Sequence, residues 1–226
     1  MAPDVREEHP EGTLNIRAML TGSIKRLAHV YRFSSLPVIR RENVAEHTCF
    51  VSIFCLLIGK DLEQRGWNVD YEKLLKNSLL HDIDESLSGD FLRCVKYGIP
   101  GLKQLLDEAS HGFMKDIGDQ LKIDLIPDWK DAKDESLEGS VLAVADLLGV
   151  ISYVLEEFAG GNRHLLYILK EVDGYYERLE KTIQSPMMKY VRDARKLILE
   201  IHEQFANPLY PTLMEPNDVP ESARNS

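Results

Sequence analysis

The stretch from Val141 to Ile151, VLAVADLLGVI, has apolar residues on every side of a single charged residue, Asp146. A helix that is apolar all round is buried inside a domain, so we expect this segment at the centre of the fold. A buried, unpaired carboxylate costs several kcal/mol and therefore needs a cation, a metal ion or a proton. Asp146 is either a hydrogen-bonded structural residue or part of a charged site, and both interpretations stay open at this point.

Most of the chain has the periodicity of helices. Apolar residues recur at helical spacing, and alternating apolar and polar runs bounded by turn signals are nearly absent. Thr13 could cap the first predicted helix and Asp70 the third, and Gly160-Gly161 would end the most apolar one. We therefore predict an all-α helical bundle. The predicted helices cover about residues 14–30, 43–64, 70–81, 102–121, 134–158, 162–184 and 187–206.

The two ends of the chain differ in composition from the middle. Residues 1–12 are polar and charged, and residues 207–226 contain four prolines. Both patterns are typical of flexible segments. We predict a single domain over residues 13–206, because a chain of 226 residues can bury a sizeable core without disulfides.

Charge and cysteine content restrict the partners and the location. Lys and Arg total 27 against 37 Asp and Glu, which gives a net charge of -10. Nucleic acids and anionic membranes attract basic surfaces, so we expect neither as a partner. The longest apolar stretch, Cys49–Gly59, is shorter than the roughly 18 residues of a membrane span. The three cysteines lack paired spacing and the N-terminus has no apolar signal core, so we expect a cytoplasmic protein.

Polar residues stand out at three places in the predicted core. His47 lies on the apolar stripe of the second predicted helix, and His81 and Asp82 end the third. Each has an ordinary interpretation, as a hydrogen-bonded core histidine or a solvated helix end. Together with Asp146, however, two neutral imidazoles and two carboxylates would neutralise a divalent cation. Such mixed nitrogen and oxygen ligands suit Co, Mn, Fe, Ni or Zn better than Mg, so we predict a central metal site.

Glu85 follows at a spacing that places it near this set. It comes three residues after Asp82 and four after His81, so the three side chains can share one helix face. Carboxylates on one face repel each other unless a positive charge lies between them. Glu46, beside His47, is a candidate for supporting that residue.

The order His, His-Asp, Asp resembles the HD superfamily of metal-dependent phosphohydrolases. The longer segments RFSSLPVIRRENVAEH, LLHDIDESLSGD and VADLLGVISYVLEEFAGGN resemble its bacterial 5′-deoxynucleotidase branch, in the same order and with similar gaps. The likeness runs from about Ile24 to Asn162 and implies the HD-domain helical fold with its central metal.

The resemblance implies roles in metal binding and proton transfer. The residues that would hold one divalent transition metal (Co, Mn or Zn, with Mg less suited) are His47, His81, Asp82 and Asp146. Glu85, together with Asp82, would act as general acid and base near the attacking water. Proteins of this superfamily with two metals have two further histidines between the His-Asp pair and the last Asp. Only His111 lies there, which favours one metal.

The resemblance also implies a binding site for a deoxynucleotide. Arg32 and Lys96 would bind the 5′-phosphate, and Asp90 would help to hold the nucleotide. Phe33 would lie beside the sugar or base, where the family usually has Trp. The family further implies a homodimer.

One loop departs from the family pattern. The family usually has a proline-rich turn after Gly89-Asp90, whereas this chain continues with Phe91-Leu92-Arg93-Cys94. Arg93 is an additional cation that could meet a second or third phosphate.

Three functions follow from these observations. The first is metal-dependent removal of the 5′-phosphate from deoxyribonucleoside monophosphates. The second is a dNTP phosphohydrolase or triphosphohydrolase, for example on dATP, that depletes a nucleotide pool. The third is a non-catalytic helical module that binds metal and nucleotide. The chain has all four candidate ligands together with Glu85, Arg32 and Lys96. This complete set argues against a non-catalytic module.

Overall fold

The computed structural model describes residues 14–130, 132–165 and 185–205, together with residues 168, 172, 179 and 181. The predicted flexible ends and most of the helix predicted at 162–184 lie outside the described residues. No strand occurs within them, and the all-α prediction is confirmed. The helices are α1 Ile16–Thr21, α2 Val44–Gln64, α3 Tyr71–Leu80, α4 Glu85–Ser88, α5 Arg93–Gly98, α6 Leu102–Leu121, α7 Ile126–Lys130, α8 Leu137–Ala159 and α10 Met188–Phe205, with 3₁₀ segments η1 Ser23–His29 and η2 Ser185–Met187.

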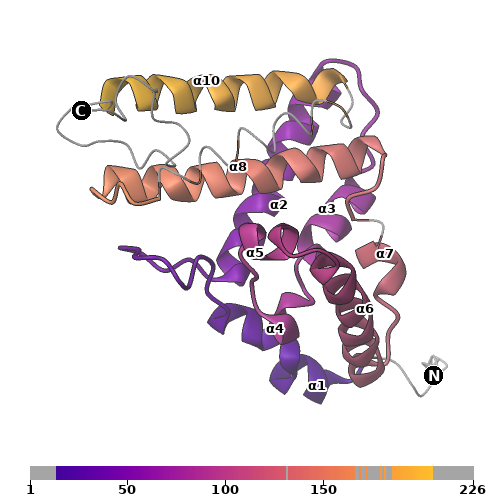
Figure 1. Ribbon diagram of the computed structural model, residues 1–226. Coiled ribbons are helices and arrows are strands. Elements are labelled where there is room, and N and C mark those ends of the chain that lie inside the picture. The colour runs from indigo at the N-terminus through magenta and orange to yellow at the C-terminus, as the bar shows by residue number, and fades with distance from the viewer. Residues whose placement is uncertain are drawn as a thin grey trace, which may run out of the picture.

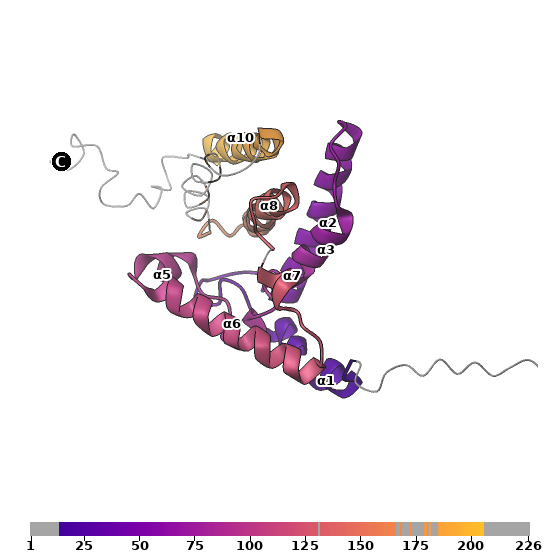
Figure 2. The ribbon, with the colours of Figure 1, turned by 90° about the vertical axis from the view of Figure 1, so that its right-hand side faces the viewer.

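The apolar helix α8 occupies the core, as its sequence predicts. α2 packs against α8, and α3 packs against both. α10 runs beside α8 on another side, which is visible in two perpendicular views (Figures 1 and 2). Val141, Leu142 and Val144 of α8 are fully buried, as are Val51 and Cys55 of α2. Burial of a large aliphatic side chain contributes about 1.5–3 kcal/mol, so this contact dominates the packing.

A second apolar cluster holds the elements of the N-terminal half of the chain together. It lies where η1, α4 and α6 meet the start of α2, in the lower part of Figure 1. The buried residues of this cluster are Leu27, Val44, Ile83, Met114, Ile117 and Leu121. Because Ile83 belongs to this cluster, the cluster holds the turn after α3 in place. This turn carries two of the predicted metal ligands, His81 and Asp82.

Capping residues explain the helix boundaries. Asn43 accepts the Glu46 N–H and Asp70 accepts the Lys73 N–H, so α2 and α3 begin as predicted. The Glu46 carboxylate in turn accepts the Asn43 N–H, which completes a capping box. Glu46 was expected to support His47, and the bond that the structure shows for it is this cap. α8 begins at Leu137 and not at residue 134, because Ser136 is its cap.

The helix predicted over 14–30 is two separate elements. α1 is capped by Asn15, and the chain breaks at Gly22, whose backbone is extended, before η1. The Gly22 N–H bonds to the Ala18 carbonyl so closely that a Cβ at this glycine would lie 2.2 Å from the Ala18 oxygen. α4, α5 and α7 were not predicted, because helices of four to six residues are too short for an apolar period to show.

The loop of residues 31–43, which carries Arg32 and Phe33, is fixed to the C-terminal end of α8. The carboxylate of Glu157, which is 2% exposed, accepts the backbone N–H groups of Ile39 and Arg40, each at 2.7 Å. The Tyr153 hydroxyl donates to the Arg40 carbonyl at 2.6 Å. These bonds tie the loop to α8.

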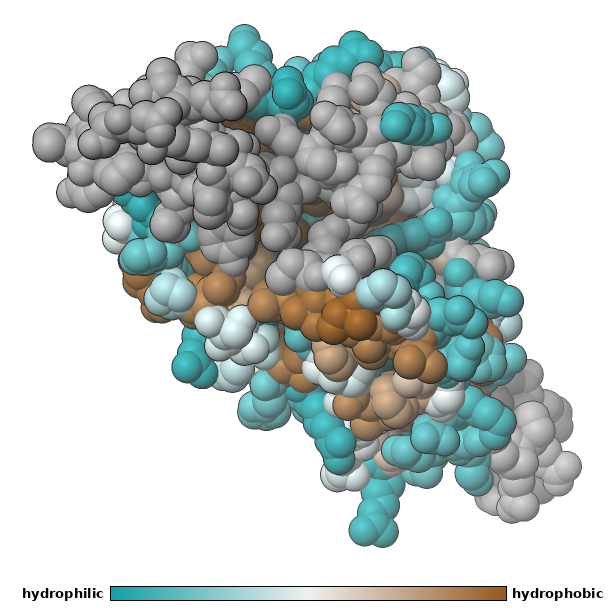
Figure 3. All heavy atoms as spheres, viewed as in Figure 1, coloured by the Kyte–Doolittle hydropathy of each residue, from teal (hydrophilic) through white to brown (hydrophobic). Residues whose placement is uncertain are grey.

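The surface has an apolar region near the shorter helices. In Figure 3, apolar residues gather below α8, where α4, α5 and α6 lie. The exposed large apolar residues of this part of the chain are Phe91, Val95, Ile99 and Leu105. In the described part of the chain, no helix combines the length and the apolar character that crossing a membrane requires.

The Glu157 bonds predict a pH-dependent stability. Burial alone would raise the pKa of Glu157, but the hydrogen bonds from Ile39 and Arg40 outweigh it and lower the pKa. The ionised carboxylate therefore stabilises the fold above its unfolded pKa, and this contribution is lost as pH falls through the folded pKa. We expect Glu157→Gln to lower the free energy of unfolding by about 1–3 kcal/mol at pH 7, since charged hydrogen bonds are lost.

Denaturant unfolding of both proteins at pH 7 and near pH 3 checks this. The difference between wild type and variant should shrink at the acidic pH. Glu156→Gln is the matched control, because Glu156 is the neighbouring carboxylate and its side chain is 55% exposed. An equal loss in the two variants would contradict the assignment.

Candidate metal centre

Four polar side chains meet where α2, α8 and the turn after α3 come together. His47 Nε2 lies 3.0 Å from Asp146 Oδ1 and 3.8 Å from Asp82 Oδ2, and His81 Nε2 lies 3.0 Å from Asp82 Oδ2. Both imidazoles are almost fully buried, whereas the side chains of Asp82 and Asp146 are 21% and 22% exposed. The structure brings together all four residues that the sequence singled out, with the carboxylates partly open to solvent.

A glycine makes the approach of α2 to α8 possible at this point. Gly149 lies one helical turn after Asp146, on the face of α8 that meets His47. A Cβ at Gly149 would come within 2.9 Å of the His47 ring. The absence of a side chain there lets the imidazole lie between the two helices, next to Asp146.

The pair His81 and Asp82 has the donor chemistry of a metal site. His81 Nδ1 lies 2.7 Å from the Ser78 carbonyl oxygen, which can only accept, so Nδ1 carries a proton. In the neutral ring, Nε2 then presents a lone pair toward the Asp82 carboxylate, and this buried nitrogen has no hydrogen-bond partner. Two electron-pair donors 3.0 Å apart require a proton or a cation between them. A ligating histidine whose other N–H bonds a backbone carbonyl is the usual arrangement in metal sites.

The remaining ligand atoms are close enough to share one ion. Those of His47, His81 and Asp82 all lie within 4.8 Å of one another. Asp146 adjoins this group through its contact with His47. The residues therefore fit a single divalent ion with mixed nitrogen and oxygen ligands.

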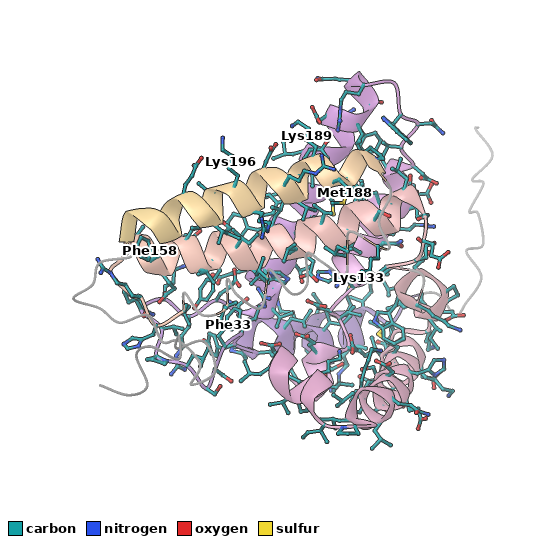
Figure 4. The ribbon with its side chains drawn as sticks, turned by 45° about the horizontal axis from the view of Figure 1, so that its top comes forward. Phe33, Lys133, Phe158, Met188, Lys189 and Lys196 are labelled. Atoms are coloured by element: carbon teal, nitrogen blue, oxygen red, sulfur yellow. The ribbon has the colours of Figure 1, made fainter. Side chains whose placement is uncertain are left out.

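Two cations of the protein contact the candidate ligands. Arg32 Nη1 lies 2.7 Å from His47 Nδ1 and 2.8 Å from Glu42 Oε2. Because a guanidinium can only donate, His47 Nδ1 accepts and the proton of the neutral ring lies on Nε2, which donates to Asp146 Oδ1. His47 Nε2 would therefore serve as a metal ligand once Arg32 has left Nδ1 and the proton has moved there. Lys133, in the connection before α8, donates to Asp146 Oδ2 at 2.6 Å. Figure 4 shows Phe33 and Lys133 on the side of α8 that faces away from α10. Lys133 thus offsets part of the negative charge of the site.

The pKa values reflect this balance of charge. Burial opposes ionisation of Asp146, but Lys133 and His47 outweigh it and hold the pKa of Asp146 well below its usual range. Burial lowers the pKa of His47, and the adjacent Arg32 lowers it further. Burial likewise disfavours the imidazolium of His81, yet the Asp82 carboxylate raises the pKa of His81 above its ordinary value. For Asp146 and His81, the charges of neighbouring groups therefore outweigh the effect of burial on the pKa.

Glu85, the predicted acid–base residue, begins α4 beside this cluster. Burial raises the pKa of Glu85 well above its usual range, and the negative charges of Asp82 and Asp90 add to the effect, while Arg32 opposes it. A carboxyl group with a raised pKa near an anionic cluster is typical of a residue that transfers protons.

Arg32, Phe33 and Asp90 form a connected group at the edge of the cluster. The Phe33 backbone N–H lowers the pKa of the Asp90 carboxyl against the larger, raising effect of burial. The Phe33 ring stacks on Tyr153 with 5.4 Å between centroids and 3° between planes. Phe33 has a φ of 52°, a left-handed conformation that is unfavourable for a side chain of this size. Strain of this kind is often found at ligand-binding residues.

Lys96, another predicted phosphate-binding cation, is not part of this group. Lys96 lies on α5 and makes no hydrogen bond or ion pair with the cluster in the part of the chain that the structure describes. The side chain of Arg93 lies outside the described residues. Three residues at the site were not predicted from the sequence: Lys133, Glu42 and Tyr153. Lys133 gave no signal because it lies in a polar connection, whereas Glu42 and Tyr153 fall within the segments that carry the family resemblance.

Comparisons with known proteins assign the chain to a family. A model of the YfbR-like 5′-deoxynucleotidases matches residues 19–200. The chain belongs to the YfbR-like family. No curated protein matches it in sequence. The membership and the fold confirm the expected class, an HD-domain phosphohydrolase.

Solved structures support the fold of this YfbR-like protein. An HD-domain phosphohydrolase from Listeria innocua superposes with a TM-score of 0.69 at 22% identity, over 83% of this chain and 90% of the other. A conserved protein from Pyrococcus furiosus gives 0.63 at 25% identity, over 82% and 99%. The HD phosphohydrolase DatZ of cyanophage S-2L, solved with dA and one catalytic Zn2+ ion, gives 0.59 at 16% identity, over 80% and 96%.

The gap between His81 and Asp82 predicts stabilisation by a metal ion. A ligand at about 100 times its dissociation constant adds about 2.7 kcal/mol of stability. For a chain of this size, that raises the melting temperature by roughly 5–10 °C. We expect this increase when Co2+, Mn2+ or Zn2+ is added to chelator-treated protein in a thermal unfolding experiment.

The His81→Ala variant should lose most of the increase, because it lacks the unpaired nitrogen. His29→Ala is the control, since His29 is an exposed histidine at the end of η1. An increase of the same size in His81→Ala would show that the ion binds elsewhere.

Proposed function

We propose that this YfbR-like protein hydrolyses deoxyribonucleoside 5′-monophosphates to deoxynucleosides and phosphate. The observation that carries the proposal is the unpaired His81 nitrogen opposite Asp82, with Arg32 and Glu85 beside it. A cation site, a fixed guanidinium and a protonatable carboxyl group in one place are what hydrolysis of a phosphate ester requires.

One divalent transition metal, Co, Mn or Zn, is the proposed cofactor. The residues that would hold it are His47, His81, Asp82 and Asp146. When bound, such an ion acts as a Lewis acid on the phosphoryl group and makes a nucleophilic water available near neutral pH. The catalytic Zn2+ of the cyanophage neighbour supports a single ion as sufficient for this fold.

Arg32 is the proposed phosphate ligand. Its side chain is 11% exposed, and it is held from behind by Glu42 at 2.8 Å. The charges of Glu42, Asp146 and Asp90 outweigh the effect of burial and raise the pKa of Arg32, so it stays protonated. A guanidinium fixed in this way is preorganised to stabilise the charge of the transferred phosphoryl oxygens.

Glu85 is the proposed acid–base residue. Its raised pKa favours the protonated carboxyl group, which would deliver its proton to the departing 5′-oxygen of the nucleoside. Phe33, stacked on Tyr153, would present an aromatic surface to the sugar or base.

Charge at the site favours a monophosphate over a triphosphate. In the described part of the chain, the cations that contact the cluster are Arg32 and Lys133, which together suit one phosphate group. A triphosphate would need further cations, for which Arg93 is the candidate.

A product assay tests the proposal. Chelator-treated protein is reloaded with Co2+, Mn2+, Zn2+ or Mg2+ and offered each deoxynucleotide and ribonucleotide as mono-, di- and triphosphate. We expect nucleoside and phosphate from the deoxynucleoside monophosphates. Release of triphosphate or pyrophosphate from a dNTP would transfer the function to the second hypothesis. Absence of turnover despite metal binding would favour the non-catalytic module.

Two variants separate metal binding from proton transfer. Asp146→Ala should lose metal and activity together, because a ligand is removed. Glu85→Ala should keep its metal and lose turnover by about 10²–10⁴-fold, the usual contribution of general acid–base catalysis. Metal content by elemental analysis and turnover with a deoxynucleoside monophosphate measure both effects. Full activity of Glu85→Ala would refute its role.

A further inference from the structure

We propose that Lys133 is a second phosphate-binding cation of the site, and that Asp146 holds it in place until a metal ion binds. The inference rests on the proposed function, since it assumes a phosphate substrate. It assigns a role to a residue that lies outside the motifs of the sequence analysis.

Both oxygens of Asp146 are already engaged. Oδ1 faces His47 Nε2 at 3.0 Å, and Oδ2 accepts the Lys133 ammonium at 2.6 Å. An ion that takes Asp146 Oδ2 as a ligand would therefore compete with Lys133 for the same oxygen. Lys133 thus occupies the position of positive charge that the metal would supply.

The charges of the site favour exchange of one cation for the other. Asp82 and Asp146 together carry two negative charges, and the Lys133 ammonium neutralises one of them. A divalent ion would neutralise both, after which the ammonium would lie beside a positively charged centre. Like charges at such distances repel strongly in a partly buried site, so Lys133 would leave Asp146 for the nearest anion. Under the proposed function, the phosphate of the substrate would be the anion that Lys133 then contacts.

Lys133 can move, whereas Arg32 is fixed. The Lys133 side chain is 38% exposed, at the end of a flexible four-carbon stem, and its neighbour Asp134 is tied to Lys73 at 2.6 Å. Arg32 is 11% exposed and bonded to Glu42. The site would therefore combine one preorganised cation with one that arrives after the metal.

The test compares Lys133→Met with Lys133→Arg and with the control Lys73→Met. Lys73, in α3, forms an ion pair with Asp134 that has the same length as the pair of Lys133 with Asp146. The side chains of Lys73 and Lys133 are also similarly exposed. Calorimetry measures Mn2+ binding to the chelator-treated proteins and inorganic phosphate binding to the Mn2+-loaded proteins. We expect Lys133→Met to bind Mn2+ about tenfold more tightly and phosphate about tenfold more weakly than wild type. Lys133→Arg should restore phosphate binding, and Lys73→Met should change neither.

Two results would overturn the proposal. If Mn2+ binding by Lys133→Met is unchanged or weaker, Lys133 does not compete for Asp146. If Mn2+ binds more tightly but phosphate binding is unchanged, the freed lysine does not reach the phosphate. Because neither measurement uses nucleotide turnover, wild-type protein that binds Mn2+ and phosphate but hydrolyses no deoxynucleoside monophosphate would refute the proposed function alone.

Discussion

The contact between His81 Nε2 and Asp82 Oδ2 is the interaction on which the site depends. The Ser78 carbonyl fixes the proton of His81 on Nδ1, so the other nitrogen faces a carboxylate at 3.0 Å without a hydrogen bond. A buried polar atom without a partner is unfavourable by about 1–3 kcal/mol. Such an arrangement persists because a cation or a proton completes it, and the neighbouring His47 and Asp146 supply the remaining ligands.

The fold positions the His81–Asp82 contact and places cationic side chains beside it. α8 brings Asp146, α2 brings His47, and Gly149 lets the two helices approach. The second apolar cluster anchors Ile83 and with it the turn of His81 and Asp82. Glu157, at the far end of α8, fixes the loop that presents Arg32 and Phe33. One long helix thus positions both a candidate ligand and the candidate phosphate-binding loop.

The long helices and the four clustered residues could be predicted from the sequence, whereas the charge balance could not. Periodicity and caps placed α2, α3 and α6 closely, because their apolar stripes span several turns. Asp146 proved partly exposed, since its side chain faces the cluster and not the surrounding apolar residues. Lys133 escaped prediction, because its contact with Asp146 arises from the path of the connection before α8. The break at Gly22 depends on a local backbone conformation that composition does not reveal.

The central claim is that one divalent ion lies between His81 and Asp82 and is shared with His47 and Asp146. Anomalous diffraction from crystals soaked with Mn2+ or Zn2+ tests this most directly. We expect a single strong peak within coordinating distance of His47 Nε2, His81 Nε2 and one oxygen each of Asp82 and Asp146. Lys133 should be displaced from Asp146. A peak that excludes His81, or no peak within the cluster at saturating metal, would contradict it.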